Sequence, residues 1–321
     1  MYNWCRNFGF NLCTRLGINT IILEKDEIGK KATGHSSAKI TSQHGLMYSY
    51  LKNSFDNKYA KNYLEANQKA IENIKNIIKE EKINCDFEYK TNYVYTTQKS
   101  EINKIKKEVE LTNELGIKSY FITQSNLPFK IEGAIAFPDQ AQFNPAKYLN
   151  GLIKSIIKTD KSKIYTNTTV TDVKKGKYEY VVFCNDNYIK SSIVIMASHY
   201  PFINIPGFYF TKMYQSTSYV IAVETNKMKP NGMFINNTLP TYSFRTAKYK
   251  DKEIVLVGGI LHKTGRKISS ENIYKNLEKS ILSWNNTDKT WDCPCHGSRF
   301  NYKGENIYNP AFKNLETFNK D

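Results

Sequence analysis

Long apolar runs are missing from this 321-residue sequence, in which no stretch approaches the roughly 18 consecutive apolar residues of a membrane-spanning helix. Residues 1–10 include Arg6 and several polar side chains, and they lack the continuous apolar core and small-residue cleavage site of a signal peptide. The six cysteines stand at irregular spacings, which does not indicate a disulfide framework, so we expect free thiols or metal ligands. These absences predict a cytoplasmic protein without a transmembrane segment.

The sequence also lacks an excess of acidic residues. Its 46 Lys and Arg residues outnumber its 30 Asp and Glu residues, which gives a formal net charge of +16. Such a charge can indicate a nucleic-acid or anionic-membrane partner. The lysines are however scattered and interleaved with glutamates, as in Ile71–Lys82 and Glu101–Glu110. This distribution is typical of solvated helix faces, so we expect no nucleic-acid partner.

The first half of the chain predicts helices that alternate with strands. Apolar residues recur at helical spacing in Lys58–Lys82 and Glu101–Leu115, and Pro145–Ile157 follows the potential N-cap Asn144. The other expected elements are a helix end at Asn11–Arg15 with Gly17 as its terminator and strands at Asn19–Glu24 and Asp86–Thr97.

The second half of the chain predicts short strands. Near Ser280 the sequence pattern changes again, where a helical stretch ends. Together with the helices of the first half, the strands indicate a mixed α/β domain with a large antiparallel component. The expected strands are Lys163–Tyr165, Thr168–Val173, Tyr178–Cys184, Tyr188–Ala197, Ser218–Thr225 and Glu253–Val257.

Glu24 ends the first predicted strand, and a loop rich in small and hydroxylated residues follows it at 29–45. In a dinucleotide-binding unit, an acidic residue at the end of the second strand binds ribose hydroxyls, and glycine-rich turns approach the pyrophosphate. A strand that ends in glutamate is common, so Glu24 by itself could equally be a surface carboxylate. The loop composition favours a segment that runs close to an extended ligand.

Several motifs occur along residues 15–280 in an order that indicates a known family. They are Glu24, Thr33–Lys39, Phe137–Phe143, Ala197–Phe202, Leu256–Gly259 and His262–Gly265. On these motifs the chain resembles the glycine-oxidase and D-amino-acid-oxidase superfamily of flavoenzymes, especially bacterial members that carry a C-terminal Rieske domain. The resemblance implies a mixed α/β (α+β) fold: an FAD-binding Rossmann-like domain with a substrate domain, followed by a small all-β Rieske remnant.

The resemblance also implies how the chain would hold FAD. Glu24 would bind the adenosine ribose, and Val170, beside Thr169, would lie near the adenine. The residues that would approach the pyrophosphate or the flavin, or otherwise contact the cofactor, are Ser36, Ser37, Ala38, Lys39, Gly258 and Gly259.

The sequence departs from this family in two places. The three glycines of the pyrophosphate turn would fall at Met1, Asn3 and Arg6, whose bulky side chains prevent the close backbone approach that glycine permits. The family also continues through a long flavin-contacting stretch after Gly265, whereas here Arg266–Ser280 leads directly to the next motif. We therefore expect an FAD-dependent domain over residues 1–280 that is incomplete at both ends.

The motif Trp291–Phe300 resembles the second ligand loop of a Rieske protein, Cys-x-x-His-Gly. A Rieske cluster binds one iron through two cysteines and the other through two histidines. By resemblance, Cys293 and His296 would be ligands of different irons, and Cys295 would pair with a bridging cysteine of the first loop. Residues 281–321 would then be a Rieske domain that contains only its second ligand loop.

The first ligand loop, Cys-x-His followed by Gly-Cys, is not found upstream of this motif. The nearest candidates are Cys184 and His262, which do not have that spacing. Haem attachment requires Cys-x-x-Cys-His, and a structural zinc site would need a second ligand pair nearby. The cysteines could also bind no metal at all.

The resemblance implies an FAD-dependent oxidoreductase that oxidises a small-molecule amine or amino acid and passes electrons through a 2Fe-2S cluster to an unknown acceptor. The alternative is a catalytically inactive remnant or interaction module that lacks flavin and cluster. No catalytic residue is assigned. Arg245 could bind a substrate carboxylate or be a surface arginine. The histidines in the matched loops, which could be structural or catalytic, are His35, His44, His199 and His262.

Overall fold

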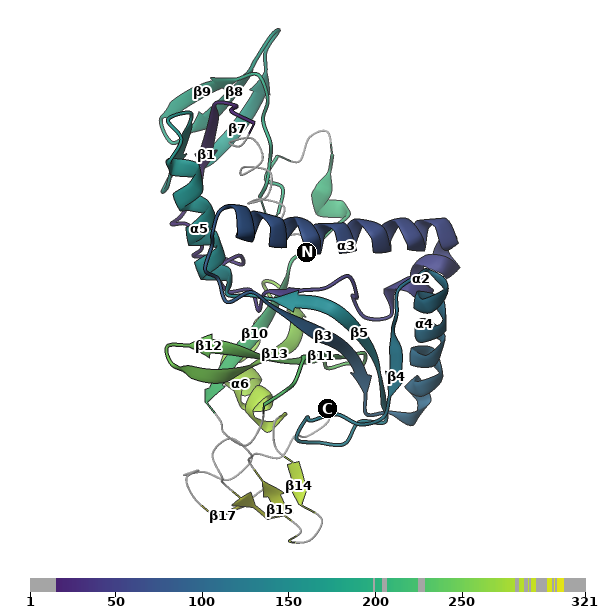
Figure 1. Ribbon diagram of the computed structural model, residues 1–321. Coiled ribbons are helices and arrows are strands. Elements are labelled where there is room, and N and C mark those ends of the chain that lie inside the picture. The colour runs from purple at the N-terminus through teal and green to yellow at the C-terminus, as the bar shows by residue number, and fades with distance from the viewer. Residues whose placement is uncertain are drawn as a thin grey trace. The chain divides into compact units, whose positions relative to one another are not determined.

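The computed structural model describes residues 16–198, 200–203, 207–224 and 229–280, and beyond them 283–285, 288, 290–292, 299–301, 303 and 305–308. The chain divides into two compact units. The first unit comprises Met1–Ala38, Asn73–Phe87 and Phe143–Gln215, and the second comprises Lys39–Glu72, Glu88–Gln142 and Ser216–Asp321. Each unit is described by itself (Figure 1).

The first unit contains a parallel strand pair and a three-stranded antiparallel sheet. Strand β1 (Thr20–Leu23) pairs in parallel with β6 (Ser162–Tyr165), and helix α5 (Pro145–Ile157) precedes β6 in the chain. The Asn144 side chain accepts hydrogen bonds from the amides of Ala146 and Lys147, which confirms it as the N-cap of α5. The antiparallel sheet consists of β7 (Val170–Lys175), β8 (Tyr180–Cys184) and β9 (Asn187–Ser191), and the short helix η2 (Tyr209–Thr211) follows it.

The second unit is built on an eight-stranded, mainly antiparallel sheet in the order β10-β13-β12-β11-β3-β5-β2, with β4 on β5. Its strands are β2 (Lys39–Ile40), β3 (Glu88–Thr96), β4 (Tyr120–Ile122), β5 (Gly133–Gln142), β10 (Ser216–Glu224), β11 (Met233–Asn236), β12 (Tyr242–Tyr249) and β13 (Lys252–Lys263). Its helices are α2 (Met47–Ser54), η1 (Lys99–Glu101), α4 (Ile102–Glu114) and α6 (Ser270–Lys279), and α3 (Asn57–Glu80) begins in it.

Two apolar clusters cover the two faces of this sheet. Because successive strand residues point to opposite faces, Val94 and its neighbour Tyr95 belong to different clusters. One cluster joins Tyr95 to Leu277 of α6, and the other joins Val94 to residues of α2, α3 and α4. The amphipathic helices are therefore held by burial of their apolar sides against the sheet.

The sheet is interrupted between β3 and β12, because β11 has only four residues. It pairs with β3 over Asn92–Tyr95 and with β12 only at Ser243 and Phe244. The start of β3 at Glu88 and the part of β12 beyond Phe244 therefore have no β11 residue between them. This interruption positions the polar cluster described below.

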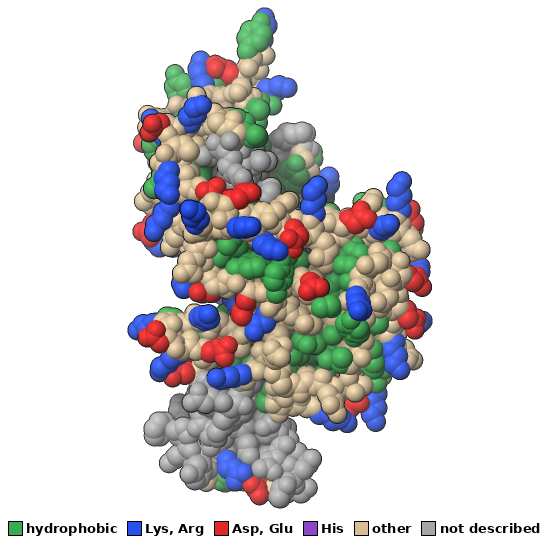
Figure 2. All heavy atoms as spheres, viewed as in Figure 1, with side chains coloured by type: hydrophobic (Ala, Val, Ile, Leu, Met, Phe, Trp, Pro, Cys, Tyr) green, Lys and Arg blue, Asp and Glu red, His purple; other side chains and the backbone are tan. Residues whose placement is uncertain are grey.

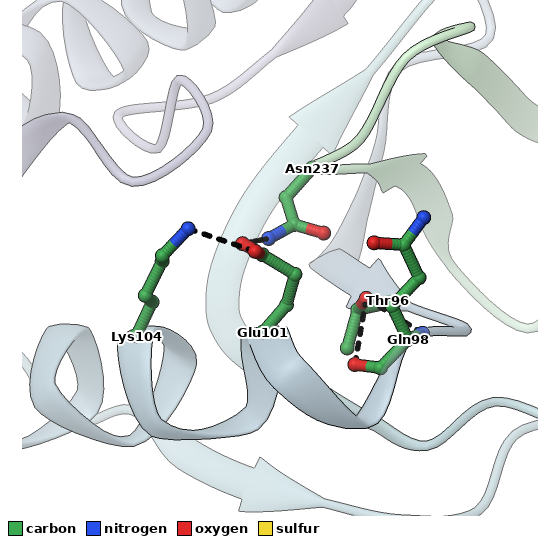
Figure 3. Close-up of polar contacts among 5 residues, drawn as sticks. All are labelled: Thr96, Gln98, Glu101, Lys104 and Asn237. Carbon is green, nitrogen blue, oxygen red and sulfur yellow. Dashed lines mark hydrogen bonds and ion pairs between the residues drawn. The ribbon is translucent and has the colours of Figure 1, made fainter.

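A small group of polar contacts fixes the end of β3 to the loop that follows β11 (Figure 3). The Asn237 amide donates to the Tyr95 carbonyl at 3.0 Å, and Asn237 Nδ2 donates to Glu101 Oε2 at 3.0 Å. Lys104 Nζ donates to the other oxygen of Glu101 at 2.7 Å. The Gln98 amide donates to Thr96 Oγ1 at 3.1 Å, which closes the turn before η1.

Four short antiparallel strands follow α6: β14 (Ser283–Asn285), β15 (Thr290–Asp292), β16 (Arg299–Phe300) and β17 (Asn306–Tyr308). Their order is β14-β15-β16-β17, with Trp284 opposite Trp291. The Rieske-like residues between β15 and β16, including Cys293 and His296, lie outside the described residues.

The mixed α/β fold expected from the sequence is confirmed, with local differences. The expected helix Lys58–Lys82 corresponds to α3, and the expected strand Asn19–Glu24 corresponds to β1. The expected strand Tyr188–Ala197 was too long, because β9 ends at Ser191. The helix end expected at Asn11–Arg15 lies outside the described residues.

Lys and Arg side chains are spread over the visible face of both units, among acidic side chains (Figure 2). Several form ion pairs within one helix, such as Lys61 with Glu65 and Lys275 with Glu271. In the part of the chain that the structure describes, no helix combines the length and the apolar character needed to cross a membrane.

Candidate functional site

Glu24 lies directly after β1, where the first unit brings two distant segments together. Its amide donates to the Tyr165 carbonyl at 2.9 Å, and its carbonyl accepts from the Thr168 amide at 2.9 Å. Val170 begins β7 two residues later. The parallel pair therefore places Glu24 beside the segment that leads into Val170. The family resemblance implies that Glu24 and Val170 contact the adenosine half of FAD.

The half-buried Glu24 carboxylate uses one of its oxygens locally. Oε1 accepts from the Asp26 amide at 3.1 Å, whereas Oε2 makes no hydrogen bond with any residue in the described ranges. A carboxylate at the carboxyl end of a parallel strand is the group that binds ribose hydroxyls in dinucleotide-binding units. The free oxygen of Glu24 fits that role. The positions of the pyrophosphate glycines, Met1, Asn3 and Arg6, are not among the described residues.

The loop between Glu24 and β2 folds tightly on itself. A Cβ at Gly34 would lie 1.9 Å from the Gly29 carbonyl oxygen, so no side chain fits there. The Ala38 amide donates to Ser36 Oγ at 3.0 Å, and Ala38 is buried with a left-handed φ of 46°. Ser37 is half-buried. Residues 29–38 therefore pack closely on their own backbone in the first unit.

In the second unit, Lys39, Gln142 and Glu88 form one row across β2, β5 and β3. The register places Lys39 opposite Gln142 and Gln142 opposite Glu88, so their side chains share a face. Gln142 Nε2 donates to Glu88 Oε1 at 2.5 Å and to the Thr246 carbonyl of β12 at 3.0 Å. The Gln142 side chain thus connects β5 to β12 across the interruption of the sheet.

Lys39 is the half-buried first residue of β2. Burial, together with the positive charge of Arg245, lowers the pKa of Lys39 to about 7. Across the described part of the chain, the Lys39 ammonium makes no hydrogen bond or ion pair. A lysine without a counter-charge in such a place is unusual, because a buried cation normally has a partner.

Arg245 lies on β12 and is only 3% exposed, so it is not a surface arginine. Its Nη1 donates to the Thr246 carbonyl at 3.0 Å, and its Nε has no hydrogen-bond partner. Burial lowers the pKa of Arg245 to about 10, an effect that Glu88 partly opposes. No described carboxylate lies within 4.0 Å of this guanidinium.

The loop that follows β2 is held by buried hydrogen bonds around Ser42 and Gln43. The Ser42 amide donates to Gln140 Oε1 at 2.6 Å, and Gln68 Nε2 donates to Ser42 Oγ at 2.8 Å. Asn92 Nδ2 donates to Gln43 Oε1 at 3.0 Å. These bonds join the loop to β5, α3 and β3, so they hold the segment after Lys39 in place.

His44 forms a 2.7 Å hydrogen bond through Nδ1 with the Tyr63 hydroxyl of α3. Burial lowers the pKa of His44 to about 4, so the imidazole is neutral at neutral pH. His35 is exposed and contacts only the Lys31 carbonyl, whereas His262 contacts the Tyr219 hydroxyl at 3.1 Å. His199 lies outside the described residues. The neutral, half-buried His44 was not distinguished from the other histidines by sequence.

Gly258 and Gly259 lie within β13, between β10 and β12. A Cβ at Gly259 would lie 2.2 Å from the Thr241 carbonyl oxygen, and one at Gly258 would lie 3.1 Å from Ser243 Oγ. Close packing against β12 therefore requires glycine at position 259. Sequence reasoning assigned both glycines to the cofactor and did not foresee this packing role.

The metal ligands expected from the sequence, Cys293 and His296, lie outside the described residues. Within the described ranges, no group of three or more His, Cys, Asp or Glu side chains could hold a metal ion. Cys85 and Cys184 are buried free thiols. Burial raises the pKa of Cys85 to about 11, so this thiol stays protonated.

The profile of the family described as FAD dependent oxidoreductase matches residues 10–285. This chain belongs to that family. It is 32% identical over 266 residues to YhfW of Bacillus subtilis (strain 168), a protein named for a Rieske 2Fe-2S iron-sulfur centre. The match covers 83% of this chain and 52% of YhfW, so the chain spans about half the length of that relative.

Solved structures of flavoenzymes share the fold. Glycine oxidase from Bacillus cereus ATCC 14579 aligns with a TM-score of 0.62 and 15% identity, over 84% of this chain and 73% of that one. L-α-glycerophosphate oxidase from Mycoplasma pneumoniae, solved with FAD bound, aligns with a TM-score of 0.58 and 15% identity, over 84% and 74%. At these identities the likeness is one of fold.

Proposed function

We propose that this chain is the FAD-binding part of an oxidoreductase that oxidises a small-molecule amine or amino acid. Membership of the FAD dependent oxidoreductase family and the fold shared with glycine oxidase support this proposal. The flavin, when bound, supplies the acceptor of the hydride. Electrons would then leave through a 2Fe-2S cluster to an acceptor that remains to be identified.

The observation that carries the proposal is the meeting of Glu24 with the segment 168–170 after two parallel strands. Glu24 Oε2 would accept a hydrogen bond from an adenosine ribose hydroxyl, and Val170 would contact the adenine. The remaining residues proposed to approach the cofactor are Ser36, Ser37, Ala38, Lys39, Gly258 and Gly259. The tight turn at Gly29 and Gly34 supports a close backbone approach in that loop.

We further propose that residues 1–280 form the flavin-dependent part and 281–321 the iron-sulfur part. Cys293 and His296 would each bind a different iron of the cluster. A Rieske cluster needs four protein ligands, so two more must come from outside this pair. The likeness to YhfW, whose name refers to a Rieske centre, supports this assignment.

The proposal is tested by FAD titration of the purified chain, followed by quenching of flavin fluorescence. Glu24→Ala should weaken FAD binding by about 1.5–3 kcal/mol, since the lost bond involves a charged acceptor. Glu27→Ala, which removes an exposed glutamate of the same loop, is the matched control and should bind FAD as the unchanged chain does. Equal binding by the Glu24→Ala variant would contradict the assignment.

An iron assay and an absorption spectrum on the same preparation address the cluster and the alternative. Flavin bands together with stoichiometric iron support both cofactors. A chain that binds neither added FAD nor iron would instead be a non-catalytic remnant or interaction module. Loss of iron in Cys293→Ala, with FAD binding retained, would separate the two parts.

A further inference from the structure

The segment around η2 in the first unit, residues 207–214, exposes a group of large apolar side chains and is called the aromatic loop below. Its exposed side chains are Phe208, Tyr209, Phe210, Met213 and Tyr214. Their exposed fractions run from 42% at Tyr209 to 69% at Tyr214. Single exposed apolar residues are normal on a protein surface, whereas a contiguous group of them marks a site of contact with an apolar partner.

The backbone of the aromatic loop pairs its own polar groups around η2. The Thr211 amide and the Thr211 hydroxyl both donate to the Phe208 carbonyl, at 3.1 Å and 2.8 Å. The amides of Lys212 and Met213 both donate to the Tyr209 carbonyl at 3.0 Å. Because backbone groups leave water at little cost only when they are hydrogen-bonded, this turn is suited to an environment without water.

Phe208 holds the turn in a strained conformation. Its φ of 45° and ψ of 45° lie in the left-handed region, which a residue with a bulky side chain rarely adopts. The rings of Phe208 and Phe210 contact each other edge to face, with centroids 6.3 Å apart. Both rings are more than half exposed, so burial within the first unit does not offset the strain. Burial against a partner would offset it.

The charge of the aromatic loop favours an anionic partner. No Asp or Glu occurs in residues 187–223, and the whole chain carries a formal net charge of +16. Lys212 is exposed and forms no hydrogen bond or ion pair among the residues that the structure describes. Aromatic side chains beside a lysine are typical of segments that lie at the interface of a lipid bilayer.

We propose that the aromatic loop anchors the protein to the surface of an anionic lipid bilayer. Phe208 and Phe210 insert below the lipid headgroups, and Lys212 lies beside the lipid phosphates. A protein partner fits less well, because protein interfaces contain about one hydrogen bond per 100–200 Å² and the backbone groups described above are already paired. This inference is independent of the oxidoreductase function.

Sedimentation of the full chain with lipid vesicles at low salt tests the anchor. The unchanged chain should bind vesicles of phosphatidylcholine with phosphatidylglycerol, and it should bind vesicles of phosphatidylcholine alone more weakly. Phe208→Asn together with Phe210→Ser removes both rings, and asparagine tolerates the left-handed φ of position 208. This double variant should bind at least about tenfold more weakly. Lys212→Ala should weaken binding to the anionic vesicles about fivefold.

Phe55→Ser is the matched control, because Phe55 is a phenylalanine of similar exposure, 59%, that belongs to the second unit. It should bind vesicles as the unchanged chain does. Insertion is measured with Phe210→Trp, whose fluorescence should shift to shorter wavelength when anionic vesicles are added. Phe55→Trp should show no such shift. If the double variant does not fold, as judged by circular dichroism, Lys212→Ala and Phe210→Trp still decide.

Vesicle binding that persists in the double variant, or equal binding to neutral and anionic vesicles, would overturn the inference. Analytical ultracentrifugation of the same samples separates another occupant of the loop. A dimer that the double variant converts to a monomer, without vesicle binding, would assign the loop to contact between two copies and overturn the lipid anchor. A monomeric chain that binds no vesicles would overturn it as well.

Discussion

The buried carboxylate of Glu108 on α4 accepts two backbone hydrogen bonds from α2. Oε1 accepts from the Tyr48 amide at 2.8 Å, and Oε2 accepts from the Ser49 amide at 2.7 Å. Helix α2 has no acidic residue in its first turn, and Leu46 at its N-cap forms no side-chain cap bond. Glu108 therefore supplies from another helix the acceptor that free N-terminal amides require. This contact fixes α2 against α4.

Replacement of Glu108 should destabilise the protein. Glu108→Ala leaves the Tyr48 and Ser49 amides without their acceptor, at an expected cost of about 1–3 kcal/mol in the free energy of unfolding. Urea denaturation followed by circular dichroism measures the loss. Glu110→Ala removes an exposed glutamate from the same helix and should cost much less. Equal costs would show that Glu108 does not cap α2.

The same carboxylate should contribute to the pH dependence of stability. Burial raises the pKa of Glu108, so the folded state holds this proton to higher pH than the unfolded chain, whose value is about 4.3. The contribution of Glu108 protonation to the free energy of unfolding is therefore complete below about pH 4.3 and is lost as the pH rises through the pKa of the folded state. The difference in unfolding free energy between the unchanged chain and Glu108→Gln should fall over that range; a difference that rises would contradict the prediction.

His44 should act in the opposite pH direction. Burial lowers its pKa to about 4, below the value of about 6.5 in unfolded chains. The contribution of His44 to the free energy of unfolding is therefore complete above pH 6.5 and is lost as the pH falls toward 4. His44→Gln should remove that part of the acid sensitivity between pH 6.5 and 5. His35→Gln, at an exposed histidine, serves as the control. The measurement is the unfolding free energy at each pH. If His44→Gln and the unchanged chain show the same dependence of this free energy on pH, the prediction is wrong.

Lys39 should make the protein more stable at alkaline pH. Its folded pKa of about 7 lies below the unfolded value of about 10.4, so the folded state binds fewer protons between these values. The free energy of unfolding should rise from pH 7 to pH 10 relative to that of Lys39→Met. Lys248→Met should show no such difference from the unchanged chain. A Lys39→Met variant that keeps the full pH dependence would contradict the pKa assignment.

Gly34 should tolerate no side chain. Gly34→Ala places a Cβ against the Gly29 carbonyl oxygen, a backbone atom that cannot rotate away, so the loop must open at a cost above about 2 kcal/mol. The Cβ of Gly45→Ala has open space around it. Only the left-handed φ of 65° should lower the free energy of unfolding, by about 1 kcal/mol. Thermal unfolding of both variants gives the comparison; a larger loss in Gly45→Ala would contradict it.

The parts of the fold that depend on local sequence could be predicted. Helix α5 was identified from its N-cap Asn144, and α3 from the apolar spacing of Lys58–Lys82. Both signals depend only on residues that are close together in the sequence. Helix α2 was missed, since the acidic group that caps it belongs to Glu108, far along the chain. Long-range partners of this kind leave no local signal.

The same limit explains what was found and missed at the candidate site. Glu24 could be selected as a candidate because a strand that ends in an acid is a local pattern. The burial of Arg245 could not be predicted, because it depends on tertiary packing around β12, which neighbouring residues in the sequence do not reveal. The neutral state of His44 likewise depends on its burial beside Tyr63 of α3.

Anaerobic mixing of the FAD-loaded chain with amino acids tests the central claim most directly. Flavin absorbance should bleach when an amine or amino acid that the chain oxidises is added. A chain that binds FAD stoichiometrically but whose flavin is reduced by neither amines nor amino acids would contradict the proposed oxidoreductase function.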